Sequence, residues 1–136
     1  MAKRGRVSAA ALAIGAVAPI GTIQRPDAPY DLTDEEAEEW WAVVNRMPAD
    51  WFPRETHALL TQYCRHVVRS RRIAQLIADC EASEDLDLEQ YDKLLKMQER
   101  EGRAISSLAT RMRITQQATV RAEKARKPSQ VKKPWE

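Results

Sequence analysis

The stretch from residue 53 to 115 constrains the fold most, because it has the pattern of two long amphipathic helices joined by a short acidic connection. Apolar residues recur at three- and four-residue intervals over residues 54–80 and 88–112, which places them on one side of each helix. The connection is short enough for antiparallel neighbours. The sequence therefore predicts a helical hairpin whose apolar stripes need cover, for which other copies of the chain are natural candidates. The residues expected at such an oligomer interface are Leu60, Val67, Ile73, Leu94, Ile105 and Leu108.

Composition and local signals outside the hairpin favour helices as well. The chain has 136 residues, enough for one domain plus tails, and its 43% hydrophobic residues come with only 4 glycines. Thr33 and Glu36 have the spacing of a capping box, which predicts a short helix over residues 34–46 that packs on the hairpin. We therefore expect an all-α fold.

Composition divides the chain into three parts. Residues 1–29 carry basic, small and proline residues without a sustained period, which predicts a flexible N-terminal arm. Residues 30–115 are expected to form a helical oligomerisation core, and residues 116–136 a basic C-terminal helix and tail. Two alternatives stay open between the last two parts: Thr115 caps a new short helix, or the second long helix continues through it.

Four aromatic residues lie in and after the predicted short helix. Trp40 and Trp41 fall on its apolar face, and Trp51 and Phe52 precede the hairpin. They flank acidic rather than basic residues. Packing of the short helix onto the hairpin is therefore favoured over base stacking on nucleic acid.

Cysteine spacing favours a cytoplasmic protein. Cys64 and Cys80 lie about 24 Å apart along one predicted helix, too far for a disulfide unless that helix breaks. Residues 3–18 imitate a secretory signal, but their apolar part is mostly alanine and is interrupted by Gly15. A secreted helical protein is therefore the disfavoured alternative. No stretch approaches the length of a transmembrane span, so no membrane partner is expected.

The usual signatures of catalysis are missing from the sequence. There is no glycine-rich phosphate loop, no GxSxG turn and no HExxH. The spacing of His57, Cys64, His66 and Cys80 matches no zinc pattern. We expect a protein that is not an enzyme, with no catalytic residues, no metal and no cofactor.

Basic residues are concentrated in segments of a chain whose net charge is only +2. Arg65, Arg69 and Arg72 share one helix face, where contact with DNA and pairing with acidic residues such as Asp79, Glu84, Asp87 or Asp92 stay equally open. The late basic run has few acids near it and suits phosphate contacts without base readout. The expected DNA-binding residues are Arg111, Arg113, Arg121, Lys124, Arg126, Lys127, Arg65, Arg69, Arg72, Lys3, Arg4 and Arg6.

The order of features from Arg4 to about Lys127 resembles the small terminase subunits of tailed double-stranded DNA bacteriophages or prophages. The segments that carry the resemblance are Arg4-Gly5-Arg6, residues 25–33, Trp40-Trp41, residues 59–64, and Met112-Arg113-Ile114-Thr115 leading into Arg121. The last of these replaces the family's usual Gly-Leu-Thr-Pro with Arg113-Ile114-Thr115-Gln116.

The resemblance implies a non-catalytic packaging factor. Small terminase subunits form rings of roughly eight to eleven copies with closed symmetry. They recognise double-stranded viral DNA, and they recruit and regulate the large terminase subunit, an ATPase and nuclease. Such a protein is expected in the cytoplasm of the bacterial host and not in the mature virion. The alternative is a helical protein–protein interaction module whose basic tails only confer solubility.

Overall fold

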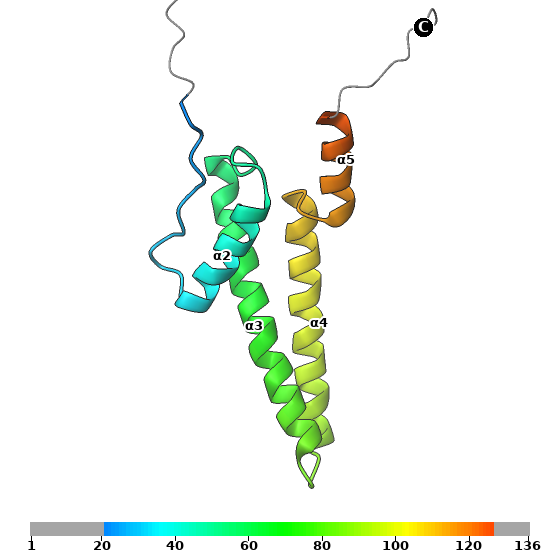
Figure 1. The fold of residues 1–136 in the computed structure, drawn as a ribbon. Coiled ribbons are helices and arrows are strands. Elements are labelled where there is room, and N and C mark those ends of the chain that lie inside the picture. Colours follow the sequence, from blue (N-terminus) through cyan, green and yellow to red (C-terminus); the bar gives the residue numbers. More distant parts are fainter. Residues whose placement is uncertain (1–20, 127–136) are drawn as a thin grey trace, which may run out of the picture.

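The computed structural model describes residues 21–126, and every regular element in this range is a helix (Figure 1). The α-helices are α2 (Asp34–Arg46), α3 (His57–Ala82), α4 (Leu88–Arg111) and α5 (Gln116–Arg126), and a short 3-10 helix, η1 (Arg54–Thr56), precedes α3. The all-α expectation is confirmed for this range. α3 and α4 run antiparallel side by side, while α2 lies against α3 and α5 extends beyond the end of α4 (Figure 1).

The capping box predicted for α2 is present. The Thr33 hydroxyl accepts a hydrogen bond from the Glu36 amide at 3.3 Å, and the Glu36 carboxylate accepts one from the Thr33 amide at 3.0 Å. These bonds satisfy two donors that a helix start otherwise leaves without partners. The short helix therefore begins where its local sequence says it should.

Part of the expected free N-terminal arm is instead bound to α2. The Arg25 guanidinium donates to the carbonyls of Val44 and Met47, both at 3.3 Å, and the Trp40 indole donates to the Pro26 carbonyl at 3.1 Å. The last carbonyls of a helix lack partners within it, so a cation that reaches them is stabilised there. The expected arm, residues 1–29, therefore includes residues that contact α2, while residues 1–20 lie outside the described range.

The core lies where α2, the connection after it and the start of α3 meet. Trp40 and Leu60 are fully buried, and Phe52 is nearly so. Trp41 and Trp51 are half-buried against this cluster. The packing role expected for the four aromatic residues is confirmed.

α3 and α4 meet along one seam that is apolar at its two ends and polar in its middle. The covered positions on α4 alternate three and four residues apart, as in paired helices of the coiled-coil type: Tyr91, Leu94, Gln98, Glu101, Ile105, Leu108 and Met112. In the middle, His66 Nδ1 of α3 lies 2.5 Å from Glu101 Oε2 of α4. A polar pair at one level of an apolar seam favours a single register of the two helices.

The helical conformation is interrupted between α4 and α5. α4 ends at Arg111 and α5 begins at Gln116, so a new short helix follows a break and the second long helix does not continue. The backbone of Thr115 accepts from the amide of Thr119 at 3.1 Å, as expected for the residue that precedes a helix.

Candidate nucleic-acid interface

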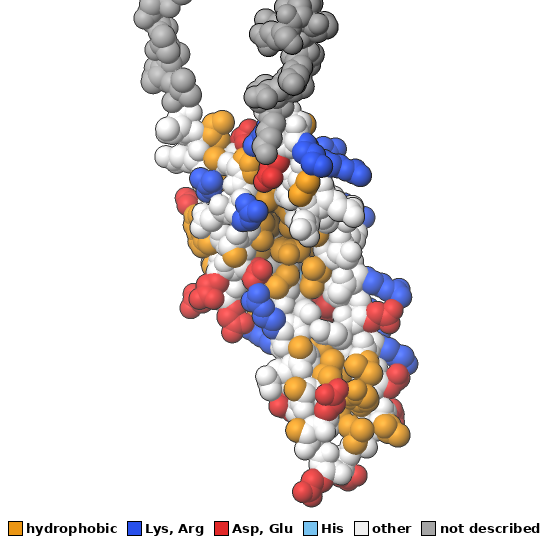
Figure 2. Space-filling model, turned by 45° about the vertical axis from the view of Figure 1, so that its right-hand side comes forward, with side chains coloured by type: hydrophobic (Ala, Val, Ile, Leu, Met, Phe, Trp, Pro, Cys, Tyr) orange, Lys and Arg blue, Asp and Glu red, His pale blue; other side chains and the backbone are white. Residues whose placement is uncertain are grey.

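Five of the expected DNA-binding residues gather at the end of the molecule opposite the α3–α4 turn. Arg111 ends α4, Arg113 lies in the junction, and Arg121, Lys124 and Arg126 lie on α5, all with exposed side chains. Figure 2 shows a group of basic side chains over α5. We call these five residues together with Arg46 the basic pole.

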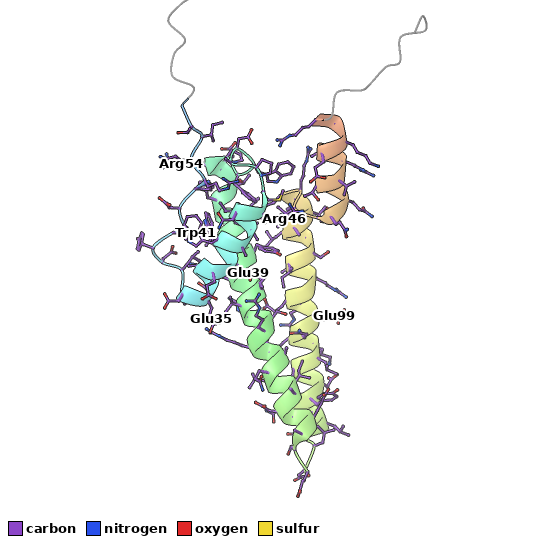
Figure 3. All side chains as sticks on the ribbon, viewed as in Figure 1. Glu35, Glu39, Trp41, Arg46, Arg54 and Glu99 are labelled. Carbon is purple, nitrogen blue, oxygen red and sulfur yellow. The ribbon has the colours of Figure 1, made fainter. Side chains whose placement is uncertain are left out.

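Arg46 belongs to the basic pole although the sequence did not indicate it. It is the last residue of α2, and Figure 3 places it beside the α4–α5 junction. It lines the same cleft as Arg126. No sequence signal could have found it, because it ends an acidic helix and lies 65 positions before Arg111 in the chain.

Trp51 lies between two adjoining clefts of the basic pole. Its indole Nε1 donates to the Met112 carbonyl at 3.1 Å, which ties the connection after α2 to the end of α4. A cleft of about 370 Å³ carries Arg46 and Arg126, and a second of about 320 Å³ carries Arg111, Arg113 and again Arg126. Guanidinium groups around a partly apolar hollow suit an anionic polymer, since each can donate to a phosphate while its stem packs on apolar surface.

Acidic residues only partly offset this charge. Asp50 lies 3.9 Å from Arg126, with both side chains more than half exposed, so the pair contributes little. Glu123 lines the larger cleft. Within residues 21–126, the other five cations of the basic pole have no ion pair.

Arg113 is held in a backbone conformation that favours glycine. Its φ is 56°, the left-handed region. The amide of Arg113 donates to the Thr110 carbonyl and that of Ile114 to the Ala109 carbonyl, both at 3.1 Å, which is the Schellman arrangement that ends a helix. This is the position where the motif of the small terminase subunits, which this segment resembles, carries glycine. A left-handed non-glycine residue costs about 1–2 kcal/mol, and such strain is concentrated at functional sites.

The arginine face of α3 is largely neutralised within the chain. Arg65 Nη2 lies 2.7 Å from Asp31, and Arg69 Nη1 lies 3.5 Å from Glu101. Arg71 Nη2 lies 2.6 Å from Glu39 of α2. Arg65 and Arg69 therefore form ion pairs, which was one of the two alternatives for this face. Their partners are Asp31 and Glu101, and not the acids near the α3–α4 turn that were given as examples. Arg72 has no ion pair among the described residues.

The terminal part of the expected DNA-binding set is not placed. Lys3, Arg4, Arg6 and Lys127 lie outside the described residues.

Three of the expected interface residues are covered within a single chain. Leu60, Ile73 and Leu94 are 0%, 3% and 7% exposed. This corrects the expectation that their stripe awaits another copy, because α2, α3 and α4 cover one another. The other three, Val67, Ile105 and Leu108, are half-buried.

The chemistry of the two thiols follows from their burial. Both are free, Cys64 buried and Cys80 half-buried. Burial, reinforced by the charges of Glu39 and Glu36, raises the pKa of Cys64 to about 12. A neutral buried thiol is not a nucleophile. Among residues 21–126, no three His, Cys, Asp or Glu side chains form a group that could hold a metal ion.

Two further findings bear on partners. Within the described helices, none is both long and apolar enough to cross a membrane. Comparison of the chain with protein families, with curated proteins and with solved structures finds no match.

Proposed function

We propose that this chain is the small terminase subunit of a tailed bacteriophage, a non-catalytic and oligomeric DNA-binding adaptor. It recognises double-stranded viral DNA, assembles as a ring of roughly eight to eleven copies, and recruits and regulates the large terminase subunit in the bacterial cytoplasm. The resemblance described above supports this proposal. The observation that carries it is the basic pole, with Arg113 kept in a strained position where it lines one of the two clefts.

The charge distribution supports DNA contact at this end over the arginine face of α3. Ion pairs already engage Arg65 and Arg69, whereas among the described residues only Arg126 of the basic pole is paired, at 3.9 Å. A cation without an acidic partner is free to replace a counterion on a phosphate, which is the main source of affinity for duplex DNA. The arginine side chains that line the clefts beside Trp51 suit contacts with DNA phosphates, which position a protein on the duplex.

The helical interaction module remains the alternative, favoured by exposed leucines on the hairpin. Leu88 is 70% and Leu76 is 52% exposed. Such a module would bind its protein partner equally well when the charges of the basic pole are removed. It would show no salt-dependent binding to DNA.

The test measures DNA affinity against salt concentration for two matched triple variants. Replacing Arg121, Lys124 and Arg126 with alanine is expected to weaken binding and to lower the slope of log K against log salt by about 0.9 for each phosphate that the variant no longer neutralises. The control replaces Lys93, Lys96 and Arg103, which pair with acids one turn away on α4. Equal losses in both variants would overturn the assignment of DNA contact to the basic pole.

A further inference from the structure

The α3–α4 turn carries acidic side chains that nothing in the described chain neutralises. From Asp79 to Asp92 there is no lysine or arginine. Glu89 and Asp92 pair with Lys93 and Lys96. Five other carboxylates at or beside the turn have no ion pair within residues 21–126: Asp79, Glu81, Glu84, Asp85 and Asp87. Figure 2 shows acidic side chains at this end and apolar side chains beside them.

A pocket of about 250 Å³ opens between these carboxylates, and we call it the tip pocket. Leu76 and Cys80 form its apolar part, while Asp79, Asp85 and Asp87 line it with charge. Leu76 is 52% exposed, and Leu88 beside the turn is 70% exposed. Apolar walls with a carboxylate rim fit a lysine or arginine, whose stem packs on leucine while its charged end pairs with aspartate.

The chain itself contains a segment of the complementary kind. Residues 127–136 carry Lys127, Lys132 and Lys133, with Val131 and Trp135 as apolar anchors and one acid, Glu136. A tryptophan among lysines has the composition of a peptide that docks through an aromatic anchor and surrounding charge. We propose that the tip pocket binds residues 127–136 of a second copy of this chain.

The reach of the chain points to a second copy. α4 has 24 residues and is therefore about 36 Å long, and α5 extends further from the turn (Figure 1). Ten residues span at most about 35 Å when fully extended. A segment that begins after Arg126 therefore falls short of the turn of its own chain.

This contact joins unlike ends of identical copies. Such a contact is heterologous and closes into a ring when the rotation between neighbours permits. It deepens the assembly part of the proposed function and does not depend on DNA binding.

The experiment uses the full chain with a photo-crosslinking residue, Trp135→p-benzoylphenylalanine. Copies with light and heavy nitrogen are mixed at high salt, returned to low salt without DNA and illuminated. Mass spectrometry is expected to find crosslinks from position 135 to residues 76–90, in pairs of mixed isotope. Crosslinks within one copy, crosslinks to α5, or no crosslink would overturn the proposal and leave the DNA-binding proposal standing.

A matched pair of variants tests the pocket chemistry. D79N/D85N removes two charges from the tip pocket and keeps Asp87, which caps α4 through the amides of Glu89 and Gln90. E35Q/E38Q removes two exposed charges from α2. The crosslink yield is expected to fall about fivefold in D79N/D85N, as for the loss of two exposed ion pairs. It is expected to stay unchanged in E35Q/E38Q. Equal yields in the two variants would overturn the role of the pocket.

Discussion

The Trp51 indole donates a hydrogen bond to the carbonyl of Met112, 61 positions later in the chain, at 3.1 Å. This bond joins the connection after α2 to the residue that follows the last residue of α4 and immediately precedes Arg113. Because Met112 is buried and its carbonyl lies at a helix end, the indole satisfies an acceptor that the helix leaves without a partner. The position of the basic pole therefore depends on the aromatic core.

Replacing Trp51 with phenylalanine tests this link. The variant is expected to lose about 1–2 kcal/mol of unfolding free energy, because a partly buried carbonyl loses its donor. Denaturant unfolding measures the loss. Trp41→Phe is the matched control, since Trp41 is half-buried against the same core and makes no side-chain hydrogen bond in the described range. An equal loss in both variants would show that only ring packing matters.

Substitutions of Arg113 can separate its effect on folding stability from its effect on DNA binding. Arg113→Gly is expected to raise the unfolding free energy by about 1 kcal/mol, because glycine adopts the left-handed conformation without steric cost. The same variant is expected to bind DNA more weakly. Arg113→Ala should lose the same affinity without gaining stability. A glycine variant that is no more stable than the alanine variant would contradict the strain assigned to this position.

Glu101 lies in the polar middle of the seam between α3 and α4. Its side chain is 12% exposed and faces both His66 and Arg69. Glu101→Ala is expected to cost about 1–3 kcal/mol, because it leaves partly buried polar groups without a partner. Glu99→Ala is the control: Glu99 pairs with Arg103 on the exposed side of the same helix and is expected to change stability by less than about 0.5 kcal/mol. Similar effects for the two variants would remove the special role of Glu101.

The two cysteines should differ in reactivity. The raised pKa of Cys64, about 12, means that its thiol stays protonated at pH values where an unperturbed thiol, with a pKa of 9.0, ionises. Thiolate is the reactive form, so a thiol reagent at pH 8–9 is expected to label one cysteine in the folded chain and two after unfolding. Peptide mapping should place the fast label on Cys80. Fast labelling of Cys64 in the folded chain would contradict its burial.

Local signals in the sequence were enough to predict the start of α2 and the approximate extent of α3 and α4. The capping box at Thr33 fixes the start of α2 through bonds that span three residues, whereas the local sequence around Thr115 left open whether the second long helix continues or breaks before Gln116. The packing function of Trp40 could be predicted because its neighbours on the same helix face are apolar.

Contacts between distant segments could not be predicted in the same way. Arg25 binds carbonyls 19 and 22 positions away, and Arg65 pairs with Asp31 at a separation of 34. Such pairs depend on how α2 crosses α3, which periodicity does not specify. Arg46 joins the basic pole for the same reason. One feature of the sequence indicated the strain at Arg113: an arginine stands where the similar motif of small terminase subunits carries glycine.

The native mass of the full chain, measured in moderate salt without DNA, tests whether the protein assembles as proposed. We expect a closed assembly of roughly eight to eleven copies, the range for a ring of small terminase subunits. A monomer at the chain mass of 15.5 kDa would contradict it.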